Sequence, residues 1–206
     1  MNIEKITFLI NKYFANISFE DRIHSLNEIR KTLSQHSPFQ HHPIDSVEWV
    51  KMSDIELNNY NPNKISPYEF TLLRVSLLRN GYTQPVIVHE ENNKYIVIDG
   101  EHRFRLGMET PELQQSLHGY IPVAKISNVH LQDRMAATIR HNRARGLNSV
   151  QGMTEIVVSL SNKGWDDEKI SSELGMEQDE ILRLKQLSGL EELFRNEEYT
   201  EAWTIT

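Results

Sequence analysis

A short segment of the sequence holds the residue types that most directly suggest chemistry. Asp99 and Glu101 carry carboxylates that could accept a proton, which makes them candidate catalytic groups. Between them, Gly100 allows a tight turn and a close approach of a ligand to the backbone. His102 and Arg103 add donors that suit phosphate oxygens, and a histidine becomes cationic near neutral pH. The segment predicts an anion-binding turn; the alternative is a helix start with surface charges.

Arginines are concentrated in a second segment, between residues 134 and 146. It contains four arginines and no acidic residue, whereas the whole chain has a net charge of −7. Such a cationic run suits a polyphosphate or the backbone of a nucleic acid. A solvated helix face is the alternative, although such faces usually mix both signs of charge. The candidate ligands in this segment are Arg140, His141, Asn142, Arg143 and Arg145.

Composition narrows the classes of function. The chain has 206 residues, of which 38% are apolar, so it can fill the core of one or two domains. It contains no cysteine, which excludes a disulfide scaffold, a thiolate metal site and cysteine catalysis. No apolar run approaches the roughly 18–20 residues that cross a bilayer, and the first residues lack the order of a signal peptide. We therefore expect a soluble, cytoplasmic protein that does not bind membranes.

The elements that would position these side chains alternate between helices and strands. A helix over 67–80, with a proline near its start and a glycine after its end, is expected to be mostly buried. Strands are expected over 85–89 and 95–98, joined by a polar turn at 91–94, and the second strand leads directly into the anion-binding turn. The other expected elements are strands over 47–50 and 120–126, a short helical turn over 54–57 and a helix that begins near residue 102.

The pattern predicts an α+β chain in three parts. Residues 1–43 form an N-terminal helical arm, because apolar residues recur there at helical spacing. The helical pattern ends at Ser37-Pro38 and His42-Pro43, since proline disfavours continuation of a helix. Residues 44–130 form a small mixed-sheet domain, and residues 131–206 form an all-α region.

The all-α region has the pattern of a helix-turn-helix unit. Its helices are expected at 153–160, 166–174 and 178–187, with a glycine between the last two. The third helix opens with three acidic residues in four positions, where a recognition helix would meet phosphates. These acids argue against sequence-specific DNA recognition by the unit.

The order of the motifs resembles the N-terminal domain of ParB proteins, whose fold is shared with sulfiredoxin and with free-serine kinases. The resemblance is carried by Asn61-Pro62, by the run 81–88 and by the run 97–103. Sulfiredoxin needs a cysteine immediately before its His-Arg pair. Glu101 occupies that position here, which excludes sulfinic-acid chemistry.

By this resemblance, the two segments together bind a nucleotide. Gly100, His102 and Arg103 would contact its phosphates, and Gln84 would lie at the mouth of the pocket. The nucleotide is CTP in partition ParB proteins and ATP or ADP in the relatives. In ParB, a Glu-Asn-x-x-Arg segment completes the nucleotide and Mg²⁺ site. Here the glutamate is either replaced by Arg140 or shifted in position, so Mg²⁺ dependence and the preference for CTP are left open and no metal ligand is assigned.

A narrower resemblance is carried by Trp49-Val50, the run 59–63, the motif Asp99-Gly100-x-His102-Arg103 and the run 133–146. It extends from about residue 47 to residue 203 and is to the IbrB-like branch of ParB-domain proteins. Members of that branch are bacterial or prophage co-activators of gene expression. They are commonly paired with a partner related to PAPS reductases, of the IbrA type. The resemblance therefore implies a regulatory protein with a protein partner, a DNA partner or both.

Three classes of function follow. The leading hypothesis is a nucleotide-binding, ParB-like regulatory protein of the transcriptional co-activator type. The alternative is a nucleotide-dependent enzyme of the same fold, either a weak NTPase or a small-molecule kinase such as a free-serine kinase. A plain DNA-binding adaptor is the third class. The sequence leaves the identity of the nucleotide and the formation of a homodimer open.

Overall fold

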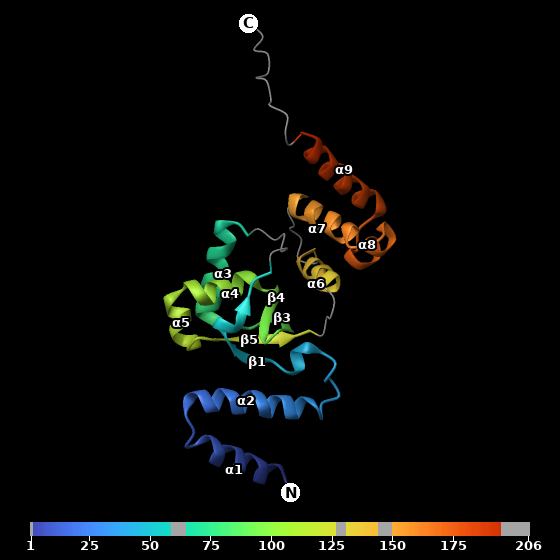
Figure 1. The fold of residues 1–206 in the computed structure, drawn as a ribbon. Helices are drawn as coiled ribbons and strands as arrows, with labels where there is room; N and C mark the ends of the chain where they lie inside the picture. Colours follow the sequence, from blue (N-terminus) through green and yellow to red (C-terminus); the bar gives the residue numbers. More distant parts are fainter. Residues whose placement is uncertain (1, 59–64, 127–130, 144–149, 195–206) are drawn as a thin grey trace. The chain divides into compact units, whose positions relative to one another are not determined.

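The structure, a computed structural model, describes residues 2–58, 65–126, 131–143 and 150–194 (Figure 1). These residues fall into two compact units. The described parts of Met1–Leu57 and Pro67–Ser127 form the first unit. Those of Asn58–Ser66 and Asn128–Thr206 form the second. The division into three parts expected above stays a prediction.

A five-stranded mixed sheet is the centre of the first unit, with strand order β1-β5-β3-β4-β2. β3 pairs with β4 in antiparallel and with β5 in parallel orientation, β1 is antiparallel to β5, and β2 is parallel to β4. The strands are β1 (Glu48–Lys51), β2 (Ile55–Glu56), β3 (Val86–Glu91), β4 (Lys94–Asp99) and β5 (Tyr120–Lys125).

The hairpin between β3 and β4 confirms the predicted turn. Asn92 and Asn93 both adopt positive φ, at 51° and 61°. Two central residues with positive φ make a tight hairpin turn whose twist matches that of the strands, and asparagine tolerates this conformation well. The turn sends β4 back along β3, so that β4 ends at Asp99.

Three helices lie together on the sheet: α3 (Pro67–Asn80), α4 (Glu101–Glu109) and α5 (Pro111–Leu117) (Figure 1). The bounds of α3 agree with the prediction, but its burial does not. Leu77 is buried, whereas Leu72, Val75 and Leu78 are 51%, 39% and 40% exposed. The residues of α3, α4 and α5 that do pack inward join the core of the sheet, which includes Val86, Val88, Val97, Phe104, Leu106, Leu113, Ile121 and Val123.

The predicted helical turn over 54–57 is wrong. A short 3₁₀ turn, η2 (Met52–Asp54), comes first, and Ile55 and Glu56 then form β2 beside Tyr95 and Ile96 of β4. The pairing that makes these two residues a strand is with a segment about forty positions away, so no local pattern reveals it.

The N-terminal helices α1 (Ile3–Phe14) and α2 (Phe19–Ser34) confirm the helical expectation. Asn2 and Ser18 cap them by accepting hydrogen bonds from backbone N–H groups three residues on. α2 is attached to β1 through the side chain of Asn27: its Nδ2 donates to the carbonyl oxygen of Trp49 at 2.7 Å, and its Oδ1 accepts from the Trp49 N–H at 2.9 Å. After α2, a 3₁₀ turn, η1 (Pro43–Asp45), leads into β1.

The second unit consists of α6 (Leu131–Arg143), α7 (Val150–Asn162), α8 (Asp167–Leu174) and α9 (Gln178–Phe194) in its described part. Asp166 caps α8 by accepting from the Lys169 N–H at 2.7 Å, and Gly175, the glycine expected between the last two helices, ends it with positive φ. The core of the unit includes Ile139, Leu160, Trp165, Ile170, Leu174 and Ile181.

The two units confirm the predicted fold class, an α+β chain with a small mixed sheet, an N-terminal helical arm and C-terminal helices. Within the residues that the structure describes, no helix has the length and apolar character that a membrane span requires.

Candidate functional site

The turn between β4 and α4 is built around a glycine. Gly100 has φ 91° and ψ 22° and is the N-cap residue of α4, without a side-chain cap. A Cβ atom at this position would lie 2.9 Å from Nη2 of Arg103, which is closer than side-chain atoms normally approach. Glycine is therefore required at position 100 for two reasons: the backbone is left-handed there, and the Arg103 guanidinium packs closely against Gly100.

Replacement of Gly100 by alanine is expected to lower the free energy of unfolding of the first unit by about 2–4 kcal/mol. The left-handed backbone accounts for about 1–2 kcal/mol, and displacement of the Arg103 guanidinium accounts for the rest. Gly119→Ala is the matched control, because Gly119 also has positive φ (81°) but has no heavy atom within 4 Å of the added Cβ. Chemical denaturation of both variants measures the difference; equal losses would contradict the proposed contact.

Arg103 is buried, with 8% of its surface exposed, and its guanidinium is held inside the unit. Nη1 donates to both the backbone carbonyl and the side-chain Oε1 of Gln84, each at 3.1 Å. Nη2 forms an ion pair with Oδ2 of Asp99 at 3.5 Å. The structure thus brings together Gln84, Asp99, Gly100 and Arg103, four of the predicted site residues, and gives Arg103 the role of fixing the turn.

His102 is half-buried in the first turn of α4, edge-on to the ring of Phe70 with ring centroids 6.2 Å apart. Its Nε2 is buried and has no hydrogen-bond partner among the described residues. Burial lowers the pKa of His102 from its usual value; the Glu101 and Asp99 carboxylates oppose this change, and Arg105 adds to it. Burial therefore favours the neutral imidazole, whereas the sequence suggested a ring that becomes cationic near neutral pH.

The two candidate catalytic carboxylates both lie in ion pairs. Asp99 is paired with Arg103, and Glu101 is paired with Arg105 at 2.7 Å. Among the described residues, no group of three or more histidine, aspartate or glutamate side chains is arranged to hold a metal ion. Each candidate carboxylate therefore has a cationic partner on α4.

Tyr82 is a residue of this site that the sequence analysis did not single out. Its hydroxyl donates to the carbonyl oxygen of Arg103 at 2.6 Å. The pKa of Tyr82 is raised to about 12, because the effect of burial exceeds the opposing effect of the nearby Arg103 charge. Gly107 leaves room for this contact, since a Cβ there would lie 2.7 Å from the Tyr82 hydroxyl. Tyr82 belongs to the motif 81–88, so the signal was present in the sequence.

The arginine-rich segment lies in the second unit, on α6 and beyond. Arg140 is exposed, and its Nη1 donates to Oε2 of Glu173 at 2.5 Å and to the Glu173 carbonyl at 3.2 Å. The side chains of His141, Asn142 and Arg143 lie outside the described part of the chain, and so does Arg145. A site shared by this segment and the Gly100 turn stays a prediction, because the two belong to different units.

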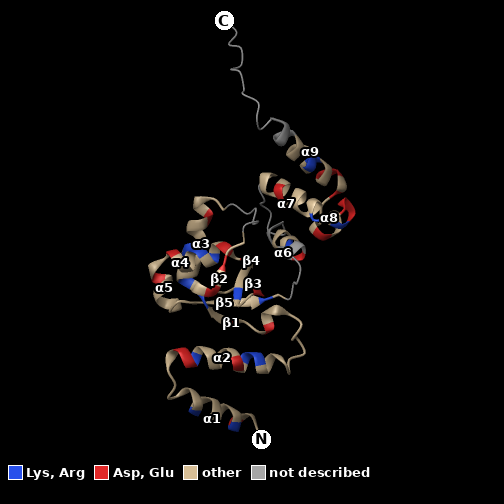
Figure 2. Cartoon of the chain, in the orientation of Figure 1, with Lys and Arg blue, Asp and Glu red and all other residues tan. Residues whose placement is uncertain are grey.

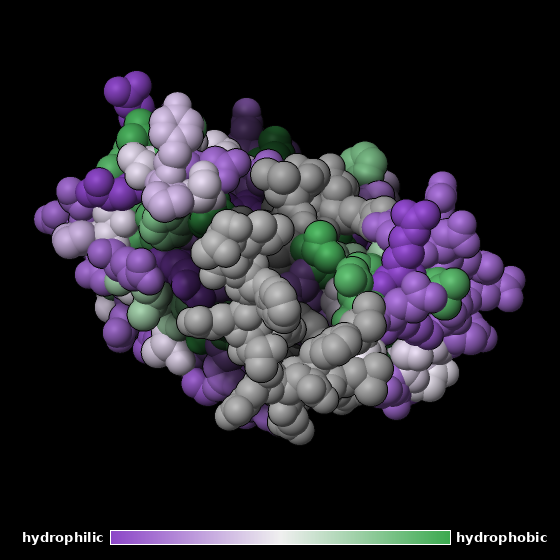
Figure 3. Space-filling model, turned by 90° about the horizontal axis from the view of Figure 1, so that it is seen from above, coloured by the Kyte–Doolittle hydropathy of each residue, from purple (hydrophilic) through white to green (hydrophobic). Residues whose placement is uncertain are grey.

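The helix-turn-helix part of the second unit presents mostly negative charge. Figure 2 shows acidic residues gathered on α8 and at the start of α9, and in Figure 3 the surface at the right, where α8 lies, is mostly hydrophilic. Two of its cations are engaged: Lys185 pairs with Asp167, and Nζ of Lys169 lies 4.3 Å from the centroid of the Trp165 ring. This charge distribution does not suit the phosphates of a DNA duplex.

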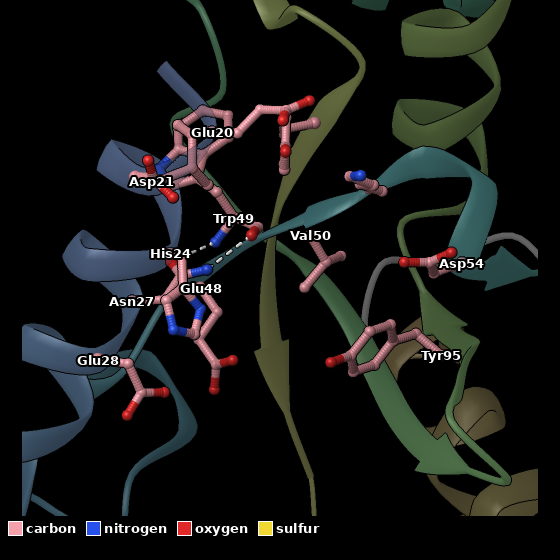
Figure 4. A pocket seen from close by; sticks show the side chains of 13 residues that line it. Glu20, Asp21, His24, Asn27, Glu28, Glu48, Trp49, Val50, Asp54 and Tyr95 are labelled. Carbon is pink, nitrogen blue, oxygen red and sulfur yellow. Dashed lines mark hydrogen bonds between the residues drawn. The ribbon is translucent and has the colours of Figure 1, made fainter. Parts of the chain in front are cut away.

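A pocket of about 520 Å³ lies in the first unit between α2 and β1 (Figure 4). Its carboxylates outnumber its cations, so it does not suit a nucleotide phosphate. Figure 4 shows the two hydrogen bonds between the side-chain amide of Asn27, in the middle of α2, and the backbone of Trp49. The charged residues of the lining are Glu20, Asp21, Glu28, Glu48, Asp54 and Lys51.

Comparisons with known proteins match two family models to successive parts of the chain. The family model of the ParB N-terminal domain matches residues 36–142, more than half of the chain, and that of the IbrB-like C-terminal HTH domain matches residues 149–196. The uncharacterized protein YbdM of Escherichia coli (strain K12) is 46% identical over 203 residues, which are 98% of this chain and 97% of YbdM. Stage 0 sporulation protein J of Bacillus subtilis (strain 168) is 31% identical over 97 residues, which cover 43% of this chain and 34% of that protein.

Among solved structures, the C-terminally truncated chromosome-partitioning protein ParB from Caulobacter crescentus, complexed with CTP-gamma-S, is similar with a TM-score of 0.40 and 17% identity. The similarity covers 69% of this chain and 78% of that one. The ParB match contains the Gly100 turn with Gln84 and Arg103, and the second match contains α7, α8 and the described α9. This chain therefore belongs to the ParB N-terminal domain family and carries an IbrB-like C-terminal helix-turn-helix domain.

Proposed function

We propose that this protein is a nucleotide-responsive regulator and that the phosphates of the nucleotide bind at the Gly100 turn. The observation that carries the proposal is the buried Nε2 of His102, which has no hydrogen-bond partner in the described part of the chain. A buried polar atom without a partner is costly, and a ligand that supplies one recovers that cost. The match to the ParB N-terminal domain, which includes this turn, supports the proposal.

The local backbone suits an anion. α4 begins at Glu101 directly after the left-handed Gly100, and no side chain caps its first N–H groups. The N-terminus of a helix carries a partial positive charge, and its first N–H groups point away from the helix toward a ligand. A phosphate at this point would be held by the backbone of α4 and by His102, while Arg103 keeps the turn in shape through Gln84 and Asp99.

Isothermal titration calorimetry with CTP, ATP and ADP tests this role. We expect one of them to bind. His102→Gln should raise its dissociation constant roughly tenfold, because the variant loses one hydrogen bond to a charged group. Because burial lowers the pKa of His102 in the free protein, a bound phosphate would favour protonation of the ring. Binding should therefore tighten as the pH falls through the range where histidine titrates, and His102→Gln should lose that dependence.

His36→Gln serves as the control, since His36 is exposed and lies between α2 and η1, away from α4. The proposal fails if none of the three nucleotides binds, or if His102→Gln binds as the original chain does. Arg143→Ala extends the same titration to the arginine-rich segment, whose contribution is a separate part of the prediction. Recovery of the nucleotide intact after long incubation would favour a regulator, and release of phosphate would favour the enzyme alternative.

The co-activator role and a PAPS-reductase-like partner belong to the same proposal and rest on the IbrB-like match at 149–196. The acidic surface of α8 and α9 favours a protein partner with a basic surface over DNA. A fluorescence titration with a DNA duplex at increasing salt separates the two. Tight binding that falls steeply with salt would assign the unit to DNA instead.

A further inference from the structure

The pocket between α2 and β1 is not used by the nucleotide site proposed above. All of its lining residues belong to the first unit, and none of them is Gln84, Gly100, His102 or Arg103. Its volume of about 520 Å³ lies within the range of about 300–1,000 Å³ that is usual for the sites of small ligands. The pocket is therefore a second candidate site, separate from the Gly100 turn.

The lining of this pocket combines negative charge with aromatic rings. It contains five carboxylates against one lysine, Lys51, and the half-buried rings of Trp49, Tyr95 and Tyr120. Carboxylates attract a cation, and aromatic faces bind both a cation and the methylene groups that carry it. Nowhere in the described ranges are three acidic or histidine side chains grouped to hold a metal ion. The lining therefore suits an organic cation.

The protein's own Lys125 shows how residues of this lining hold an ammonium group. Its Nζ lies 3.0 Å from Oε2 of Glu48, 3.0 Å from Oε2 of Glu90 and 4.9 Å from the centroid of the Tyr95 ring. Two of these three partners, Glu48 and Tyr95, line the pocket. Since Lys125 already neutralises Glu48, a ligand would be held by the other carboxylates.

These other carboxylates lie at two ends of the pocket (Figure 4). Glu20, Asp21 and Glu28 project from α2 at the left of the view, and Asp54 lies at the right, with Tyr95. Glu20 and Glu28 are exposed and form no ion pair with any residue that the structure describes. A ligand with an ammonium group at each end would match both ends, and its methylene groups would pass the aromatic rings between them.

We propose that this pocket binds a linear polyamine, in which short methylene chains separate the ammonium groups. One terminal ammonium pairs with the glutamates of α2 and the other with Asp54. The walls of the site are fixed in advance, because Asn27 joins α2 to Trp49 through two hydrogen bonds and Nη1 of Arg30 donates to the carbonyl of Val47 at 3.3 Å. A preformed site loses little binding energy in ordering its walls.

Isothermal titration calorimetry of the full chain with spermidine, putrescine and butylamine tests the site. The titrations are made at about 0.15 M salt, which screens general attraction between charges. We expect spermidine and putrescine to bind saturably. Butylamine has the carbon chain of putrescine but only one ammonium group, so its dissociation constant should be at least roughly tenfold higher. In NMR spectra, spermidine should shift the indole N–H signal of Trp49, assigned with Trp49→Phe, and leave that of Trp165 in place.

Glu28→Gln tests the end of the pocket at α2. It keeps the shape of the side chain and removes its charge, so the dissociation constant for spermidine should rise roughly tenfold. Glu109→Gln is the matched control, because Glu109 is also an exposed glutamate on a helix of the first unit but does not line the pocket. It should leave the constant unchanged. Thermal unfolding of both variants checks that the units remain folded.

Several results would overturn the proposal. It is wrong if spermidine does not bind, or if butylamine binds as tightly as putrescine. Equal weakening by Glu28→Gln and Glu109→Gln would also overturn it, because it would show only a general attraction of polyamines to an acidic chain. So would an oligolysine peptide that binds through Glu28 where spermidine does not; the pocket would then receive a basic segment of a protein partner.

Discussion

Arg103→Ala is expected to lower the free energy of unfolding of the first unit by about 3–5 kcal/mol, the cost of breaking a buried ion pair. The guanidinium is buried and binds the Asp99 carboxylate and two oxygens of Gln84, so its loss leaves the buried Asp99 carboxylate without that cation. Urea denaturation followed by circular dichroism measures the change. Arg103→Lys should recover only part of the stability, because an ammonium group cannot reproduce the planar fork.

Arg105→Ala is the control for this prediction, because Arg105 also pairs with a carboxylate, Glu101, but its side chain is 49% exposed. Exposed pairs contribute about 0–1 kcal/mol, so this variant should be nearly as stable as the original chain. If Arg103→Ala were equally stable and had lost only nucleotide binding, Arg103 would contact the ligand instead. Because this variant combines both effects, His102→Gln is the cleaner probe of binding.

Trp165→Ala is expected to destabilise the second unit by about 3–5 kcal/mol, as for other buried tryptophans. Trp165 is 7% exposed and belongs to the core of that unit. Hydrogen exchange resolved by segment should show faster exchange in α7 to α9 and unchanged exchange in β3, β4 and β5. Lys169→Ala is the control, since its contact with the Trp165 ring is worth about 0.5–1 kcal/mol. Equal losses of protection in both units would show that they unfold together.

Elements with strong local signals could be predicted from the sequence. The proline and glycine that flank α3 gave its bounds, and the two asparagines between β3 and β4 identified the hairpin. Gly100 marked the change from strand to helix, because a left-handed residue between them leaves few alternatives. Each of these signals lies within a few residues of the feature that it predicts.

Features that depend on distant segments could not be predicted in this way. The burial of α3 was overestimated because a run of leucines shows no preferred face, and tertiary packing selects Leu77. β2 exists only through its pairing with β4. α5, which is a short helix after a proline, was not predicted, since seven residues carry too little periodicity.

The same limit applies to the candidate site. The sequence suggested that Arg103 binds phosphate. It could not show that the Arg103 guanidinium donates instead to Gln84, which lies nineteen positions earlier in the chain. It also could not show that burial beside Phe70 lowers the pKa of His102. Residue types predicted where the site lies. The roles of its members depend on contacts between β3, β4 and α4.

The double hydrogen bond between Asn27 and Trp49 has a consequence for assembly. β1 is the outermost strand on its side of the sheet, and outer strands present unpaired backbone groups to which strands of other molecules can add. The amide of Asn27 offers one donor and one acceptor, as a neighbouring strand would, and α2 packs against β1. The arm thereby closes this edge of the sheet with a helix, so that a strand of another molecule cannot add at Trp49.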